Sequence, residues 1–493
     1  MRYSPSERPR RRGVDCEDPG ASYPWIMAAA ILASSIAFID GTIVSIALPA
    51  IRADLGASLP QMQWIVNAYT LTLAAFILPG GAAGDVFGRK QVFLAGVAIY
   101  TVTSLWAGLA GSVETLILAR ALEGFGGALM VPASLALITE YVPRERRGSA
   151  IGLWSAASAA TTALGPILGG MLVDWAGWRP AVLLTVPFGA LTLLVAWRGV
   201  PGGRGGHGTM DWTGGLLVCA GLGGVAIWLT NISAGAVRDG WVWGASGVVA
   251  LCAFLVHQFR TAAPMMPLSL FRNGPFAAAN VQTLLLYGAL GGVLTYLPVV
   301  LIDARGFAAS EAGLVLLPFA LIIAALSRLA GRVLDRVGAK PLLVVGPAIT
   351  AGGFAALGLV SVQGLPSMVV LVGMVLCGVG MGITVSPIST TVMNAVSEDK
   401  AGVASGVNNA VARAAGLIGV PVFGMVGQIG FTRRAPDRSG TFGEPQSVAS
   451  GYAEAMLSGL VWVGVLGAVL ALLSALTAWR GLAGGETTTP STA

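Results

Sequence analysis

The segment Gly81-Ala-Ala-Gly-Asp85-Val-Phe-Gly88-Arg89-Lys90 returns 250 residues later as Gly331-Arg-Val-Leu-Asp335-Arg336-Val-Gly338-Ala-Lys340. Two glycines, the aspartate and the final lysine keep their positions in both copies. Each copy follows an even-numbered run of apolar residues, counted from the N-terminus. If these runs span a membrane, as argued below, both copies lie on the same side of it. The two halves of the chain therefore have the same orientation, which predicts a parallel internal repeat.

Long apolar runs dominate the chain. Of its 493 residues, 55% are hydrophobic and 11% are charged, whereas soluble domains carry about 25% charged residues. A helix needs about 20 apolar residues to cross the hydrocarbon core of a bilayer. We count fourteen such runs, at 24–49, 63–83, 91–110, 115–137, 149–173, 181–199, 211–232, 241–259, 276–302, 310–334, 341–361, 366–392, 401–428 and 455–479. The sequence predicts an all-α polytopic membrane protein with 14 transmembrane helices.

These runs divide the chain into five segments. The repeat relates the first six predicted helices to the last six, so the seventh and eighth helices belong to neither copy. We expect these two helices to pack outside any central cavity. The segments are a basic tail at 1–23, an N-terminal six-helix bundle at 24–199, a linker with two helices at 200–275, a C-terminal six-helix bundle at 276–479 and a second tail at 480–493.

The basic residues are distributed unevenly between the two sides of the predicted membrane. If both termini are cytoplasmic, the outer loops hold seven of the 29 Lys and Arg residues and the spans hold three, which leaves 19 on the inner side. Cytoplasmic loops carry an excess of Lys and Arg. We therefore expect a multi-pass protein of the cell membrane with cytoplasmic termini and no nucleic-acid partner. The outer residues are Arg52, Arg179, Arg238, Arg305, Arg433, Arg434 and Arg438, and those within spans are Arg120, Arg328 and Arg413.

The repeated segment resembles the loop signature of the major facilitator superfamily, GxxxDxxGRK, with Val86 in place of the usual arginine. This resemblance implies a gate in which the aspartate and the basic residues hold the two halves together on the inner side. The glycines would permit the close approach of helices. The residues that the resemblance assigns to this gate are Gly81, Asp85, Gly88, Arg89, Lys90 and Asp335.

Five further segments resemble the fourteen-helix drug:proton antiporter branch of this superfamily, and together they cover nearly the whole chain. They are Asp40-Gly-Thr-Ile-Val-Ser-Ile-Ala-Leu-Pro49, Trp64 with Tyr69, Arg120-Ala-Leu-Glu123-Gly-Phe-Gly126, Gly165-Pro166-Ile-Leu-Gly169-Gly170, and Gly402-Val-Ala-Ser-Gly-Val-Asn-Asn409 with Arg413. Glu123 stands where glutamine is usual in that branch. The segment from Gly165 to Gly170 is the motif associated with antiporters. We expect its glycines to let the fifth helix approach the C-terminal bundle and close the outer side.

Four charged side chains lie deep within predicted spans: Asp40 in the first, Arg120 and Glu123 in the fourth, and Arg413 in the thirteenth. A charge at the centre of a bilayer costs about 2.5–3.5 kcal/mol, so each needs a partner or a water-filled cavity. Their depths allow Asp40 and Arg120 to meet, and Glu123 shares a helix face with Arg120. Two interpretations stay open. Either Arg120 and Glu123 form a structural pair, or Asp40 exchanges a proton under the influence of Arg120, with Glu123 as a second acid.

A central cavity is expected to be lined by aromatic and amide side chains, since such walls suit apolar and often cationic compounds. Arg413 has two interpretations: it neutralises an anionic substrate, or it caps helix carbonyls inside the C-terminal bundle. The candidates for this lining are Phe38, Trp64, Tyr69, Asn280, Gln282, Tyr287, Tyr296 and Arg413.

Together these motifs predict proton-coupled export, by alternating access, of hydrophobic compounds, cationic drugs among them, or of a self-made metabolite. A uniporter or symporter of the same fold is the nearest alternative, and the antiporter motif counts against it. A membrane enzyme is a remote alternative, since no HExxH segment occurs, and a non-transporting sensor is another. We expect no catalytic residues, cofactor or metal, and a monomer whose partners are protons, a small-molecule substrate and the bilayer.

Overall fold

The chain is almost entirely helical in the part that the structure, a computed structural model, describes: residues 19–202, 210–233, 237–359, 368–397, 400–435, 442 and 451–482. A 3-10 helix at Leu268–Arg272 precedes α10. The α-helices within these residues are α1 (Pro19–Leu55), α2 (Leu59–Phe87), α3 (Arg89–Gly108), α4 (Val113–Tyr141), α5 (Arg144–Ala176), α6 (Trp178–Leu183), α7 (Thr185–Gly199), α8 (Trp212–Ser233), α9 (Val237–Arg260), α10 (Gly274–Arg305), α11 (Ala309–Val337), α12 (Ala339–Gly358), α13 (Met368–Asn394), α14 (Ala401–Thr432) and α15 (Tyr452–Gly481).

These helices account for the fourteen predicted spans. Thirteen stretches of the described residues are long and apolar enough to cross a bilayer, and α6 and α7 together form one of them, Trp178–Gly199. The fourteenth is α5, a helix of 33 residues whose part Leu164–Ala176 is apolar. The predicted all-helical membrane fold is thereby confirmed.

Large apolar side chains cover much of the outer surface. Trp175 and Phe259, for example, are 85% and 83% exposed. Soluble proteins rarely expose large contiguous apolar patches. Such a surface is stable in lipid, as expected of a multi-pass membrane protein.

The internal repeat is present in the structure. Helices α2 and α11 each have 29 residues, α3 and α12 each have 20, and the starting points within each pair differ by 250 (59 and 309, 89 and 339). The glycine between the two helices, Gly88 or Gly338, has a φ of 96° or 78°. Glycine adopts such angles without strain, so it permits the sharp turn between the helices at the same place in both copies.

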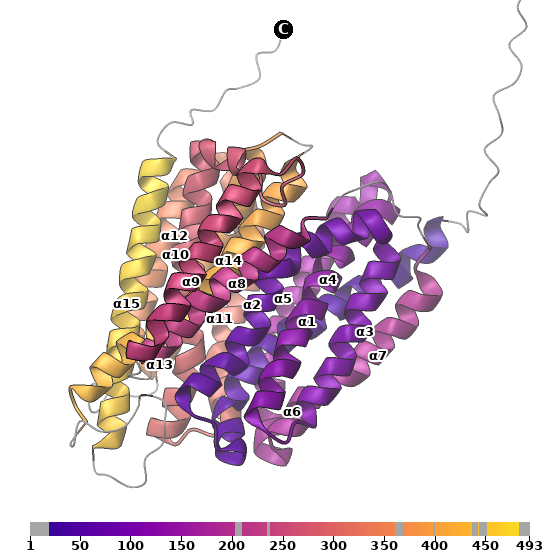
Figure 1. The fold of residues 1–493 in the computed structure, drawn as a ribbon. Coiled ribbons are helices and arrows are strands. Elements are labelled where there is room, and N and C mark those ends of the chain that lie inside the picture. The colour runs from indigo at the N-terminus through magenta and orange to yellow at the C-terminus, as the bar shows by residue number, and fades with distance from the viewer. Residues whose placement is uncertain are drawn as a thin grey trace, which may run out of the picture.

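The two repeats form two bundles that lie side by side. Figure 1 shows α1 to α7 on one side and α10 to α15 on the other. The bundles meet along two seams, one between α5 and α11 and the other between α2 and α14. The orientation of these bundles relative to the cytoplasm remains a prediction.

Helices α8 and α9 form a hairpin over the seam between α2 and α14. Leu222 and Ala226 of α8 pack against Ala74 of α2 and Leu417 of α14, and α9 packs on α8 (Figure 1). Thus α8 contacts both halves of the molecule.

The start of the hairpin is fixed by the carboxylate of Asp211. Its Oδ1 accepts a hydrogen bond from the backbone nitrogen of Gly214 at 2.7 Å and lies 2.7 Å from Nε2 of His257. Its Oδ2 accepts a hydrogen bond from Nε2 of Gln258 at 2.5 Å. One side chain therefore caps the first turn of α8 and ties it to the last turn of α9.

Candidate functional site

A buried charged cluster lies where α1 meets α4. One guanidinium nitrogen of Arg120, Nη1, lies 2.6 Å from Oδ2 of Asp40 and 2.6 Å from Oε2 of Glu123, and all three side chains are at most 2% exposed. Nε of Arg120 also donates to the carbonyl of Ile65 at 3.4 Å. Arg120 therefore contacts both of the acids that the sequence analysis considered as its partners, Asp40 and Glu123.

Helices α2 and α3 complete the cluster. The ring of Tyr69 lies 4.5 Å from the guanidinium carbon of Arg120, and the hydroxyl of Ser104 donates to Oε1 of Glu123. A side chain at Gly124 would collide with the backbone of α2, and one at Gly126 with the backbone of α3. The two glycines let both helices approach α4 closely enough for their side chains to reach the charges.

The cluster has one excess negative charge when all its groups are ionised, because one guanidinium faces two carboxylates. Burying a net charge is costly, and one bound proton would remove it. Both oxygens of Glu123 accept hydrogen bonds, whereas Oδ1 of Asp40 is buried and has no hydrogen-bond partner among the described residues. Within the described residues, Oδ1 of Asp40 is therefore the one carboxylate oxygen of this cluster that accepts no hydrogen bond.

Polar contacts join the two halves at the end of the molecule where α1 and α10 finish. Nη2 of Arg52 in α1 lies 2.8 Å from Oδ2 of Asp303 in α10. Nearby, Nε2 of Gln63 in α2 donates to the hydroxyl of Tyr296 in α10 at 2.7 Å. These contacts close the seam at this end.

The contact between α5 and α11 closes the same end. Asp174 of α5 accepts hydrogen bonds from the first two backbone nitrogens of α11, at 2.9 and 2.8 Å. A Cβ atom at Gly170 would lie 2.5 Å from the carbonyl oxygen of Ala309. Gly165 and Gly169, which the motif placed against the C-terminal bundle, pack on α1 instead. The reason is helical geometry: they are one turn apart on one face, and Gly170 points about 100° away from it.

The repeated loop makes its contacts within the N-terminal half. Arg89 lies 3.2 Å from Asp85 and 3.4 Å from Glu140 of α4, and Nζ of Lys90 donates to the carbonyl of Trp197 at 3.0 Å. Gly81 packs near α4. The counterpart side chain in the second copy, that of Asp335, lies outside the described residues. In this arrangement the loop ties α2 to α4 and α7.

Three candidates for the cavity lining have partners inside the protein. Gln282 donates to the carbonyl of Leu343 at 2.6 Å, and Asn280 accepts a hydrogen bond from Asn408 at 3.2 Å. Both amides are at most 3% exposed and stay within the C-terminal half. Tyr296 is 2% exposed and lies in the closed seam.

Except for Phe38, the other candidates lie at or near the interface of the halves. Tyr69 of α2 and Tyr287 of α10 are both within electrostatic range of Arg413 on α14. Phe38 is half-buried on α1, two residues before Asp40, and Trp64 packs against the cluster that α8 forms with α2 and α14.

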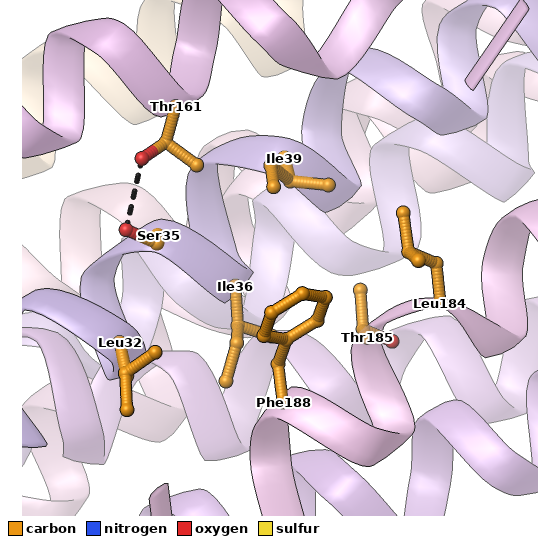
Figure 2. Close-up of a pocket in the computed structure, with 8 residues that line it drawn as sticks. All are labelled: Leu32, Ser35, Ile36, Ile39, Thr161, Leu184, Thr185 and Phe188. Atoms are coloured by element: carbon orange, nitrogen blue, oxygen red, sulfur yellow. Dashed lines mark hydrogen bonds between the residues drawn. The ribbon is translucent and has the colours of Figure 1, made fainter. Parts of the chain in front are cut away.

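A separate pocket lies between α1, α5 and α7. It encloses about 170 Å³. Figure 2 shows apolar side chains around it and the hydrogen bond of 2.9 Å between Ser35 and Thr161 at its edge. The charged cluster takes no part in its lining, which consists of Leu32, Ser35, Ile36, Ile39, Thr161, Leu184, Thr185 and Phe188.

The chain is similar to known export proteins over most of its length. The family model described as Major Facilitator Superfamily matches residues 30–420. The tetracenomycin C resistance and export protein of Streptomyces glaucescens is 34% identical over 83% of this chain and 76% of its own length. The cephamycin export protein CmcT of Amycolatopsis lactamdurans is 32% identical over 91% of this chain and 92% of its own length. The multidrug resistance protein Stp of Mycobacterium tuberculosis is 33% identical over 79% of this chain and 73% of its own length.

Solved structures with the same fold are more distant in sequence. The inward open xylose transporter XylE from E. coli has a TM-score of 0.63 and 15% identity, and the match covers 94% of this chain and 97% of that one. A bacterial homologue of the human lysosomal transporter Spinster, in an inward-facing conformation, has a TM-score of 0.64 and 18% identity. The match covers 93% of this chain and 98% of that one. At these identities the likeness extends to the fold alone.

Proposed function

Because this chain belongs to the major facilitator superfamily and to its branch of drug and antibiotic exporters, we propose that it exports hydrophobic small molecules in exchange for protons. The substrate is a drug-like compound or a metabolite that the cell makes itself. The protein is thus a membrane transporter rather than an enzyme.

The buried cluster of Asp40, Arg120 and Glu123 is the observation that carries the proton coupling. It holds two carboxylates on one guanidinium nitrogen with no exposed surface on either acid, so a change in access to water changes the free energy of proton binding. Asp40 is the proposed carrier. One proton that enters under about one pH unit and 100 mV drives roughly a 500-fold gradient of a neutral substrate.

The gating residues act at two ends of the molecule in this proposal. We assign both termini to the cytoplasm, so the contact of Gly170 and Asp174 with α11 closes the outer side in the arrangement seen here. The loop of Asp85 and Arg89 lies on the inner side. It would engage the C-terminal half when the bundles rock and the inner side closes. We further propose that residues 24–199 and 276–479 move as the two bundles and that 200–275 serves as the linker.

Proteoliposomes with an imposed pH gradient test this function. Tetracenomycin C, puromycin and methylenomycin A form a suitable first panel, because relatives are named for resistance to them. We expect a proton gradient directed opposite to substrate movement to accelerate transport, and substrate addition to release protons. Acceleration by a gradient in the same direction would indicate a symporter, and transport that is independent of the gradient would indicate a uniporter.

A further inference from the structure

Arg413 stands inside a membrane span. It is the thirteenth residue of α14, which has 32 residues, so it lies about 18 Å from one end of the helix at 1.5 Å per residue. Its side chain is half-buried. A Cβ atom at Gly406, two helical turns before Arg413 on the same face of α14, would lie 2.7 Å from the side chain of Leu78 in α2. Arg413 therefore lies on the side of α14 that faces the N-terminal half.

Arg413 lacks a counter-charge among the described side chains, unlike Arg120, the other arginine within a predicted span whose side chain is described. Arg52, Arg120 and Arg179 each contact a carboxylate. Among the described side chains, none forms an ion pair or a hydrogen bond with Arg413, and no hydrogen bond from it to a helix carbonyl is found there. The capping role that the sequence left open is therefore not observed in the described part of the chain.

An uncompensated guanidinium at this depth calls for a negative ligand or for water in a cavity. We propose that Arg413 binds the acid group of the substrate, so that the transported molecules are hydrophobic organic anions. This inference rests on the proposed function and narrows its substrate class. In this proposal Asp40 in the N-terminal half binds the proton, and Arg413 in the C-terminal half binds the substrate.

The surroundings of Arg413 suit an anion with an aromatic body. A guanidinium binds a carboxylate through two parallel hydrogen bonds and also stacks on aromatic rings. Tyr287 stands on α10 opposite Arg413, because a Cβ atom at the next residue, Gly288, would lie 3.4 Å from the carbonyl oxygen of Ala415 in α14. Asn409, one helical turn from Arg413, has an exposed side chain on the same face. A planar acid could bond to Arg413 while its apolar part packs on the tyrosine.

The direction of transport fits this charge. An anion that leaves a cell with a negative interior moves down the membrane potential, and a proton that enters does the same. Both components of the exchange are then driven by the voltage, whereas a leaving cation would oppose it.

Three pyrene compounds that share one apolar body test the substrate charge: 1-pyrenebutyrate (anionic), 1-pyrenebutanol (neutral) and 1-pyrenebutylamine (cationic). Their binding to the purified full-length protein is measured by energy transfer from tryptophan, without a pH gradient. We expect the wild-type protein to bind the butyrate at least about tenfold more tightly than the alcohol. Equal affinity for the two, or tighter binding of the amine, would overturn the proposal without any variant.

Arg413→Gln should reduce butyrate affinity to that of the alcohol and leave alcohol binding unchanged, while Arg413→Lys should retain part of the preference. Arg434→Gln removes an exposed charge beyond the end of the same helix and serves as the matched control. An equal loss for all three compounds in Arg413→Gln would show a structural role instead. Proton-driven transport is measured separately. If the protein binds anions selectively but a proton gradient does not drive transport, the proposed proton exchange is refuted while the anion site is supported.

Discussion

Arg52 of α1 and Asp303 of α10 form an ion pair of 2.8 Å between the two halves of the molecule, and their side chains are only 7% and 9% exposed. The pair lies at the end where α5 and α11 also meet. Its burial means that the loss of one partner leaves the other charge without compensation.

We expect Asp303→Asn or Arg52→Gln to destabilise the arrangement that is closed at this end by about 3 kcal/mol. The measurement is double electron–electron resonance between one spin label on the α3–α4 loop and one on the α10–α11 loop, where the distance should broaden towards an open state. The charge-swapped double variant Arg52→Asp/Asp303→Arg should restore part of the wild-type distribution. An unchanged distribution in both single variants would show that the pair does not hold the seam.

Asp40→Asn should abolish pH-driven transport and preserve substrate binding. An amide cannot take up the proton that the carboxylate of Asp40 would bind at Oδ1, the oxygen without a hydrogen-bond partner among the described residues. Proton release on addition of substrate to the purified protein, measured with a pH dye, should vanish.

Glu123→Gln and Ser104→Ala are the matched variants of this cluster. Because both oxygens of Glu123 are already bonded, we expect these variants to slow transport but to retain proton release through Asp40. Wild-type proton coupling in Asp40→Asn would exclude Asp40 as the carrier, and loss of coupling in Glu123→Gln alone would transfer that role to Glu123.

Gly170→Leu should prevent closure between α5 and α11, since even a Cβ atom there would lie 2.5 Å from the carbonyl oxygen of Ala309. Export should fall below a tenth of wild type, while expression and membrane insertion stay normal. Gly352→Leu on α12, where no atom lies within 4 Å of an added Cβ, is the control and should transport normally. Full activity in Gly170→Leu would mean that this contact is not required in the cycle.

Asp211→Asn should loosen the hairpin of α8 and α9 at neutral pH. Burial alone would raise the pKa of Asp211, but hydrogen bonds from Gln258, a backbone amide and His257 outweigh it and hold the pKa below its ordinary value of 3.8. A lowered pKa means that the stabilisation is present above pH 3.8 and is lost as the pH falls through the lower value in the folded protein.

Thermal unfolding in detergent, followed by tryptophan fluorescence, measures this effect. Asp211→Asn should unfold at a lower temperature than wild type at pH 7, and the difference should shrink as the pH is lowered below about 4. A constant difference from pH 7 to pH 3 would show that the ionised carboxylate is not the stabilising form.

The predicted orientation can be measured with single cysteines in a background that lacks the four natural ones. Gly111, between α3 and α4, and Gly202, after α7, both have open space where a side chain would be added. A membrane-impermeant maleimide should label Gly111→Cys in intact cells and should label Gly202→Cys only after the cells are opened. The reverse pattern would invert the topology.

The sequence was sufficient for the elements that follow from length and spacing. The fourteen spans and the 250-residue repeat depend on apolar runs and on glycine positions, which are local properties of the chain. The meeting of Asp40 with Arg120 also followed, because a charge inside a membrane requires a partner and few were available at that depth.

Contacts that depend on helix rotation could not be predicted in this way. Gly165 and Gly169 face α1, and the amide of Gln282 bonds within its own half; a rotation of α5 or α10 by one residue position would have placed them elsewhere. Arg52 and Asp303 gave no signal either. Each stands near the end of an apolar run, where charged residues are common, and nothing in the spacing indicates that they pair across the seam.

The equal lengths of α2 and α11, and of α3 and α12, also bear on how the chain diverged after duplication. Between residues 59 and 108 and between 309 and 358 the helix boundaries still correspond at every step. Substitutions accumulated in both copies, but no net insertion or deletion did. A single added residue would turn the rest of its helix by about 100° and carry every buried side chain away from its neighbours. The lengths of these two helices are thus a property of the fold that substitutions leave intact, because a change of length would disrupt the packing of the whole helix.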